Sequence, residues 1–227
     1  MKALPAAVVT ALVFAAAFAS NGSATNECRG ITTCIPVPGP WVAVPAHGSA
    51  TFLLSCPGGR SVVGGLDAQV TSRAVHVGFD GRLGAPVGPG VTTTRYALFR
   101  AVSTSPRPQL FQPLLGCVPV QGGGGRSTVS ARVSPPGPAA ELRSRIVVVG
   151  PGELKVARAA CLANERLAGS WSAVAFRTKQ PPPATDAQFV RVHLVAAGRQ
   201  ATATAVAADS LSIDVHAVVQ AGAVCVQ

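Results

Sequence analysis

Aromatic and acidic residues are scarce in this chain. Only 5% of the residues are aromatic, and 9 Asp and Glu stand against 19 Lys and Arg, which gives a formal net charge of +10. Sixteen of the basic residues are Arg, and they occur singly, as at Arg60, Arg73 and Arg95. No basic cluster with interleaved aromatic residues marks a nucleic-acid face. We therefore attribute the charge to an Ala-, Val-, Gly-, Pro- and Arg-rich composition, typical of a GC-rich bacterial genome. We expect no specific nucleic-acid binding, only weak retention on polyanions.

The motifs of common enzymes and metal sites are also missing. The chain has no G-x-S-x-G elbow, and the glycine run Gly122 to Gly125 lacks the Lys-Ser/Thr of a phosphate-binding loop. It has no C-x2-C and no His-x-His spacing that would favour a zinc site. We therefore predict no cofactor and no resident metal, and we do not expect an enzyme.

One long apolar run is present, at the N-terminus. Met1-Lys2 provides a positive start, Ala3 to Ala19 is almost entirely apolar, and small residues follow at Gly22-Ser23-Ala24. This pattern predicts a signal peptide over residues 1–24. A membrane anchor is the alternative, although the run is at the short limit for a span. No second stretch is as long and apolar, so we expect a protein secreted to the exterior or the cell envelope, with no membrane span after cleavage.

The cysteines suggest a disulfide framework. An even number in an exported chain favours paired cysteines. Their spacing predicts three bonds: Cys28–Cys34, Cys56–Cys117 and Cys161–Cys225. Each of the last two closes a loop of about 60 residues, worth about 4 kcal/mol in the chain-entropy model.

The surroundings of these cysteines predict an internal duplication. Gly64 and Gly169 each lie eight residues after a cysteine, and a Pro-Gly-Pro turn lies upstream of each of these cysteines, at residues 38–40 and 136–138. The copies would span residues 26–120 and 127–227, joined by a Gly-rich linker at 121–126. The second copy carries an insertion at Pro181-Pro182-Pro183.

Period-two alternation predicts strands in both copies. The alternation is clear over residues 74–80, 128–134 and 211–219. It also places Phe52, Leu54 and Cys56 on the same face of one strand, directed toward the core. Residues 157–169 have a helical composition, but their repeat partner contains Pro57-Gly58-Gly59, so we predict strand–turn–strand for both. The expected fold is all-β: two tandem antiparallel β-sandwich modules, each closed by a disulfide.

Three groups of residues are candidate sites. Ser212, Asp214 and His216 are the residue types of a hydrolase triad, but on one strand they would lie about 6.5–7 Å apart, too far for direct hydrogen bonds. We interpret them as the solvent face of a strand. His76 and His193 occupy similar positions in the two copies, and with His47 and His216 they are expected to be exposed. Trp41 and Trp171 are expected in the core rather than on a sugar-stacking surface.

The leading hypothesis is a secreted or cell-surface, non-catalytic protein that binds a cell-envelope polymer or protein. An exported hydrolase with a site assembled from separated residues is the alternative. A third possibility is an inhibitor or toxin-like effector that uses one loop, either Arg107-Pro108 or the insertion at Pro181.

Overall fold

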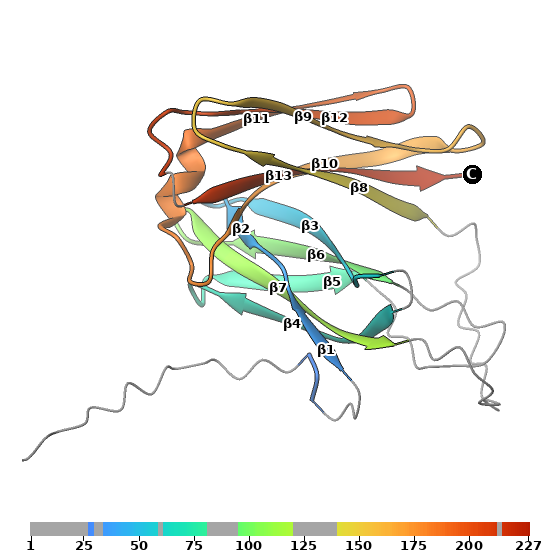
Figure 1. The fold of residues 1–227 in the computed structure, drawn as a ribbon, viewed down its shortest axis with the longest axis horizontal. Helices are drawn as coiled ribbons and strands as arrows, with labels where there is room; N and C mark the ends of the chain where they lie inside the picture. The colour runs from blue at the N-terminus through green and yellow to red at the C-terminus, as the bar shows by residue number, and fades with distance from the viewer. Residues whose placement is uncertain (1–26, 30–33, 59–60, 81–94, 120–139, 213–214) are drawn as a thin grey trace, which may run out of the picture.

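The protein is all-β. The computed structural model describes residues 27–29, 34–58, 61–80, 95–119, 140–212 and 215–227 (Figure 1). The predicted signal peptide, linker and strand over 128–134 lie outside them. In these residues no helix is long and apolar enough to cross a membrane.

The first half contains β1 (Ile35–Pro38), β2 (Trp41–Val44), β3 (Ser49–Ser55), β4 (Ser61–Val70), β5 (Val75–Asp80), β6 (Tyr96–Ser103) and β7 (Gln109–Pro119). The second contains β8 (Glu141–Val149), β9 (Leu154–Ala160), β10 (Arg166–Arg177), the 3-10 helix η1 (Ala184–Phe189), β11 (Val190–Ala197), β12 (Gln200–Ala207) and β13 (His216–Val226).

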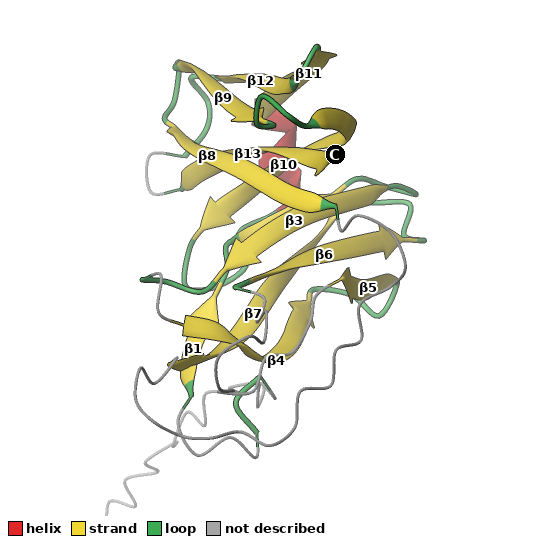
Figure 2. Ribbon diagram, turned by 90° about the vertical axis from the view of Figure 1, so that its right-hand side faces the viewer, coloured by secondary structure: helices red, strands yellow, loops and turns green. Residues whose placement is uncertain are grey.

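The described strands form three antiparallel sheets. The central sheet has the order β4-β7-β2-β10-β13-β8, and β1 precedes β2 along the same side of β7. The first outer sheet is β3-β6-β5, and the second outer sheet is β11-β12-β9. The second outer sheet is the top layer in Figure 1, and the first outer sheet lies below β8, β10 and β13. Figure 2 shows the same succession of strands from the side.

Both faces of the central sheet are buried where it passes between the outer sheets. One face contributes Val42 and Val218 to a core shared with Phe52 and Phe99 of the first outer sheet. The opposite face contributes Phe176 and Val219 to a core shared with alanines of the second outer sheet. A strand buried on both faces must be apolar at successive positions rather than at alternate ones. This explains β13, in which every residue from 217 to 223 is buried.

The two halves pair their strands in the same pattern. In the first half β7 pairs with β2 and β4, and β6 pairs with β3 and β5. In the second half β13 pairs with β8 and β10, and β12 pairs with β9 and β11. The pairing of β4 shifts between Val63 and Gly65, and that of β10 shifts between Leu167 and Gly169. The residue left out of the pairing is Gly64 in β4 and Ala168 in β10, so equivalent strands carry an irregularity at positions that differ by one residue relative to their cysteines.

All three disulfides have the pairing expected from the cysteine spacing. Cys28 is bonded to Cys34, Cys56 to Cys117, and Cys161 to Cys225. The two long-range bonds occupy equivalent places. Each joins the residue after an outer-sheet strand, β3 or β9, to the last part of a central strand, β7 or β13. Because each bond connects two layers, it anchors an outer sheet to the central sheet.

The two halves are joined through the central sheet. Strand β2 of the first half pairs with β10 of the second, with Val42 opposite Ala175 and Trp41 opposite Phe176. On its other side β2 pairs with β7 of its own half. The halves therefore share one hydrogen-bonded sheet, in addition to the packing of their side chains.

A buried glutamine makes the second connection between the halves. Gln220 of β13 is fully buried, and its Oε1 accepts hydrogen bonds from the Leu53 amide at 2.8 Å and from Trp171 Nε1 at 3.1 Å. Its Nε2 donates to the Leu53 carbonyl oxygen at 2.9 Å. Leu53 lies on β3, the edge strand of the first outer sheet. The carboxamide of Gln220 thus bonds an edge of that sheet as a neighbouring strand would.

The Trp171 indole completes this contact. Trp171 packs with Leu53 and Leu98 of the first half, and it lies opposite Gly222 in the pairing of β10 with β13. A β-carbon at Gly222 would lie 1.9 Å from Cε2 of Trp171. The indole therefore needs the glycine in order to lie across β13 and reach Gln220. Both tryptophans are buried, as predicted, with Trp41 at 4% and Trp171 at 9% exposure.

Two strand predictions have opposite outcomes. The strand–turn–strand prediction for residues 157–169 is confirmed, because β9 ends at Ala160 and β10 begins at Arg166. The strand predicted over residues 211–219 is wrong at its start, since β13 begins at His216. The chain turns before it, with hydrogen bonds from the amide of Leu211 to the Ala208 carbonyl and from the amide of Val215 to the Ser212 carbonyl.

We predict that Gln220→Leu lowers the free energy of unfolding by about 3 kcal/mol, because each buried polar group left without a partner costs roughly 1–3 kcal/mol. Urea unfolding measures the change. Gln200→Leu on the exposed face of β12 is the matched control and should shift stability by no more than about 0.5 kcal/mol. Equal effects of the two variants would show that Gln220 does not join the halves.

Candidate functional site

A cleft of about 1220 Å³ lies between the two halves. The first half supplies the turn between β1 and β2, the end of β4, and Gln112 of β7. The second half supplies the end of β10 and the loop after it. Apolar residues of β3, β8 and β13 also line the cleft. The described lining residues are Pro38, Gly39, Pro40, Trp41, Phe52, Leu54, Asp67, Ala68, Gln69, Val70, Thr71, Gln112, Ile146, Arg177, Thr178, Lys179, Gln180, Pro181 and Val218.

The loop after β10 shapes one side of the cleft. Thr178 donates a hydrogen bond from Oγ1 to the Gln180 carbonyl at 2.6 Å, which turns the chain. Three prolines follow at 181–183, and proline cannot supply an amide for sheet pairing, so β10 cannot continue. In Figure 1 this loop descends from the second half beside β2 and β7 before the chain enters η1. The insertion noted in the sequence therefore forms part of the cleft.

Hydrogen bonds hold the opposite side in place. Gln112 donates from Nε2 to the Gly39 carbonyl at 2.8 Å, linking β7 to the β1–β2 turn. Thr71 Oγ1 accepts from the Leu110 amide at 2.9 Å and lies 3.2 Å from Gln109 Oε1. Gln109 Nε2 in turn donates to Ser105 Oγ at 3.0 Å. This chain of contacts ties the loop that carries Arg107 to the wall of the cleft.

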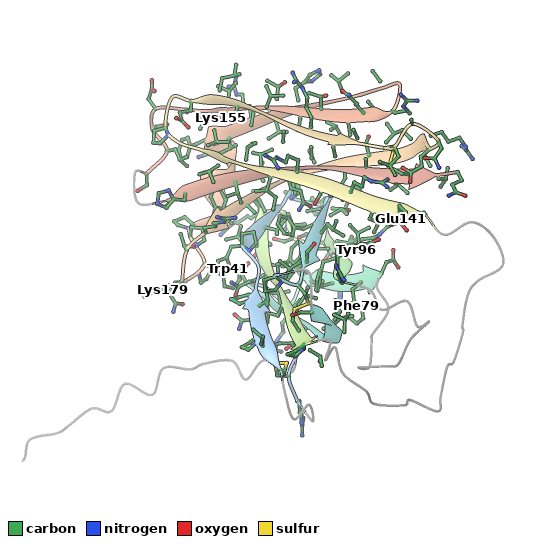
Figure 3. All side chains as sticks on the ribbon, turned by 45° about the vertical axis from the view of Figure 1, so that its right-hand side comes forward. Trp41, Phe79, Tyr96, Glu141, Lys155 and Lys179 are labelled. Carbon is green, nitrogen blue, oxygen red and sulfur yellow. A yellow bond between two sulfur atoms is a disulfide. The ribbon has the colours of Figure 1, made fainter. Side chains whose placement is uncertain are left out.

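The electrostatic character of the cleft is positive. Arg177 and Lys179 lie on its second-half side, and Asp67 is the one carboxylate among its described lining residues. The ion pairs found in the described part of the chain are Arg100–Asp80, Arg143–Glu165 and Lys155–Glu153, none of which involves the two cleft cations. Figure 3 shows Lys179 at the margin of the fold, with its side chain directed away from the sheets.

Hydrogen-bond donors predominate in the cleft. The guanidinium of Arg177 and the ammonium of Lys179 can only donate, whereas Asp67 supplies the one carboxylate of the described lining. The Trp41 Nε1 has no hydrogen-bond partner among the described residues, but it is buried and not exposed to the cleft. The lining therefore favours a ligand that offers acceptor oxygens.

The strand on which the candidate triad was placed does not include Ser212. Ser212 lies before β13 in an exposed turn segment, and Asp214 lies outside the described residues. His216 is the first residue of β13, where it is exposed and lies opposite Arg177. Because the strand does not extend back to Ser212, the shared face inferred from alternation does not exist.

The histidines lie on separate elements. His76 is exposed on β5, and His193 is exposed on β11, at topologically equivalent strands. His47 lies in the β2–β3 turn with a φ of 48°. None of the four belongs to the described cleft lining.

Cys161, Glu165 and Cys225 bring three potential metal-ligand atoms within 4.8 Å of one another. The two sulfur atoms are bonded to each other, so neither is a thiolate that could bind a metal. Glu165 is engaged by Arg143, with Nη1–Oε2 at 2.5 Å and Nη2–Oε1 at 2.9 Å, and it also accepts from the Leu162 amide at 2.8 Å. This group closes the turn between β9 and β10.

A second surface is the outer face of the second outer sheet. Strands β9 and β12 direct alanines inward, including Ala157 and Ala203, which are fully buried. Leu154 and Val206 point outward and are 61% and 42% exposed. This face is flat, and its polar side chains come from the alternate residues of three strands: Arg158, Arg191, His193, Gln200, Thr202 and Thr204.

Sequence reasoning missed most of the cleft. It singled out the Pro181 insertion, but it did not identify Gln69, Gln112, Arg177 or Lys179. One signal was available: Arg177 and Lys179 lie within four residues before the proline run, and Lys179 is one of only three lysines in the chain. Compared with protein-family models, curated proteins and solved structures, the chain has no significant match to any of them.

The contacts of Glu165 predict acid sensitivity. Its hydrogen bond with Arg143 and the bond from the Leu162 amide lower the pKa of this carboxyl below its ordinary value of 4.5. The stabilisation is therefore complete above pH 4.5 and is lost as the pH falls through the lowered folded-state pKa. We expect Glu165→Gln to be less stable than wild type at pH 7 and to lose less stability on acidification.

Urea unfolding between pH 7 and pH 3 measures this dependence. Arg143→Met, which removes the main cause of the lowered pKa, should flatten the profile in the same way. An unchanged pH profile in both variants would contradict the role of this pair.

Proposed function

We propose that the protein is an exported, non-catalytic binding protein, secreted or held in the cell envelope, that binds its ligand in the cleft between two duplicated β-sandwich halves. Its partner in this account is a polymer or protein of the cell envelope. The cleft carries the proposal, because both halves contribute polar side chains to one concave site.

Export is supported by two independent features. The N-terminal residues have the charge, apolar run and small residues of a signal peptide. Three disulfides and no free cysteine in the described chain suit an oxidising compartment.

Duplication is supported by the common strand pairing and by details of the backbone. The Cys56 amide donates to the Arg95 carbonyl, and the Cys161 amide donates to the Arg199 carbonyl, so each cysteine is bonded to the residue that precedes the paired outer-sheet strand, β6 or β12. An ancestral single module would have needed a second copy to make the cleft, since neither half contains both of its walls.

Binding is favoured over hydrolysis by the composition of the cleft. General acid–base hydrolysis uses two titratable groups or a nucleophile with an adjacent base. The described lining offers one carboxylate, Asp67, and no His, Ser or Cys. Its threonine hydroxyls are engaged: Thr71 with Leu110 and Gln109, and Thr178 with the Gln180 carbonyl. The exported hydrolase therefore remains the second candidate, and the inhibitor hypothesis has no separate observation in its favour.

A pull-down with the mature protein tests the proposal on cell-wall, polysaccharide and protein fractions. Gln69→Trp fills the cleft from β4, and Gln200→Trp adds the same bulk on the outer face of β12. We expect one fraction to retain the wild type and Gln200→Trp, and to lose Gln69→Trp by roughly tenfold or more, provided that all three have the same unfolding midpoint.

Two results would contradict the proposal. Loss of retention in Gln200→Trp with full retention in Gln69→Trp would move the site to the second outer sheet. Release of soluble fragments from any fraction, abolished by Gln69→Trp, would favour the hydrolase.

A further inference from the structure

The two cleft cations are available to an external anion. Arg177 ends β10, Lys179 lies two residues later, and neither takes part in an ion pair within the described chain. Against these two cations the described lining carries one carboxylate, Asp67. An excess of donors over acceptors selects a ligand with carboxylate or sulfate oxygens, to which charged donors make the stronger hydrogen bonds.

The rest of the polar lining suits hydroxyl groups. Gln69, Gln112 and Gln180 each carry a side-chain amide, which can both donate and accept, and sugar hydroxyls have the same double capacity. Amides that line a site together with cations recognise a ligand that bears hydroxyls and acidic groups on one molecule.

The wall of the cleft is also bonded to a neighbouring loop. Thr71 on the cleft wall contacts Gln109, and Gln109 binds the loop of Ser105 and Arg107 through Ser105 Oγ. Arg107 is exposed, and its amide donates to the same Ser105 oxygen at 3.1 Å. Arg107 itself does not belong to the described cleft lining, so Arg177 and Lys179 are the cations assigned to the ligand.

We propose that the cleft binds one chain of an acidic polysaccharide, with its carboxylate or sulfate groups on Arg177 and Lys179 and its hydroxyls on the lining amides. The inference rests on the proposed binding function of the cleft and names its ligand class. It also revises the sequence-based expectation of weak, non-selective polyanion retention. That expectation assumed that the scattered basic residues do not converge, whereas Arg177 and Lys179 line a single cleft.

Nucleic acid fits this cleft less well. Single strands are bound by stacking bases on accessible aromatic side chains. The aromatic residues of the described lining are Trp41 and Phe52, which are 4% and 0% exposed. Neither offers a ring face to a base.

Titration calorimetry with the mature protein provides the test. The probes are polygalacturonate for carboxylates, heparin for sulfates, dextran as a neutral chain, and single-stranded DNA. Arg177→Ala/Lys179→Ala removes the cleft cations, and Arg158→Ala/Arg191→Ala removes the same charge from the outer face of the second outer sheet. If the first double variant is destabilised, Arg177→Gln/Lys179→Gln replaces it.

We expect polygalacturonate or heparin, whichever carries the preferred acid, to bind more tightly than dextran or DNA. The cleft double variant should lose roughly tenfold or more in affinity, and the outer-face variant should change by less than about twofold. Binding should also weaken as salt is raised.

The outcomes separate this inference from the proposed function. Equal losses in both double variants would show general charge attraction and would overturn it. Tight binding of dextran that is lost in Gln69→Trp but kept in Arg177→Ala/Lys179→Ala would overturn the acidic ligand and leave the binding cleft in place. Preferential binding of DNA, or no binding of any probe by the wild type, would also overturn it. Retention on cell fractions would still test the proposed function independently.

Discussion

The bond between the Gln220 carboxamide and the backbone of Leu53 is the constraint on which the arrangement of the two halves depends. Strand β3 is an edge strand, and the outward amide and carbonyl groups of an edge must be paired, covered or hydrated. Here they meet a fully buried side chain of β13, which supplies one acceptor and one donor to the same residue. A polar residue at the centre of an apolar face would be costly alone, and the two bonds of Gln220 to Leu53 form only when the halves are together.

This contact also accounts for the cleft. The pairing of β2 with β10 fixes the halves at one point of the central sheet, and the Gln220 contact fixes β3 against β13 at another. With two points fixed, the end of β10 and the loop after it lie across the cleft from the end of β4 and from Gln112 of β7. The loop after β10 runs to η1 and includes three prolines, whereas the equivalent connection of the first half, between β4 and β5, is only residues 71–74. Two similar halves thereby produce one asymmetric site.

Much of the local structure could be predicted from particular residues. Alternation placed Phe52, Leu54 and Cys56 on one face and so identified the core side of β3. The spacing of the cysteines predicted the two long-range disulfides. Alternation gave the wrong prediction for β13, where it placed the face that carries His216 in solvent. Val218 and Gln220 lie on that same face of the strand, and they are buried because the first half covers it. Alternation of apolar and polar residues occurs when one face of a strand is exposed to solvent. It does not occur in a strand that is buried between two layers. The cleft was missed for a related reason. Arg177 and Lys179 lie more than 60 positions from Gln112 and the end of β4, and the β2–β10 pairing and the Gln220 contact that bring the two halves together are not visible in the sequence.

Hydrogen exchange at the Leu53 amide is the measurement that tests this account most directly. An outward amide on a free edge strand exchanges through small local openings, whereas an amide bonded inside the fold exchanges only when the surrounding structure opens. If Gln220 joins the halves, the Leu53 amide should be as strongly protected as amides of the central strands β7 and β13, with exchange requiring global unfolding. Exchange at the rate of an uncovered edge, while β7 and β13 remain protected, would contradict the claim that the two halves form one cooperative structure.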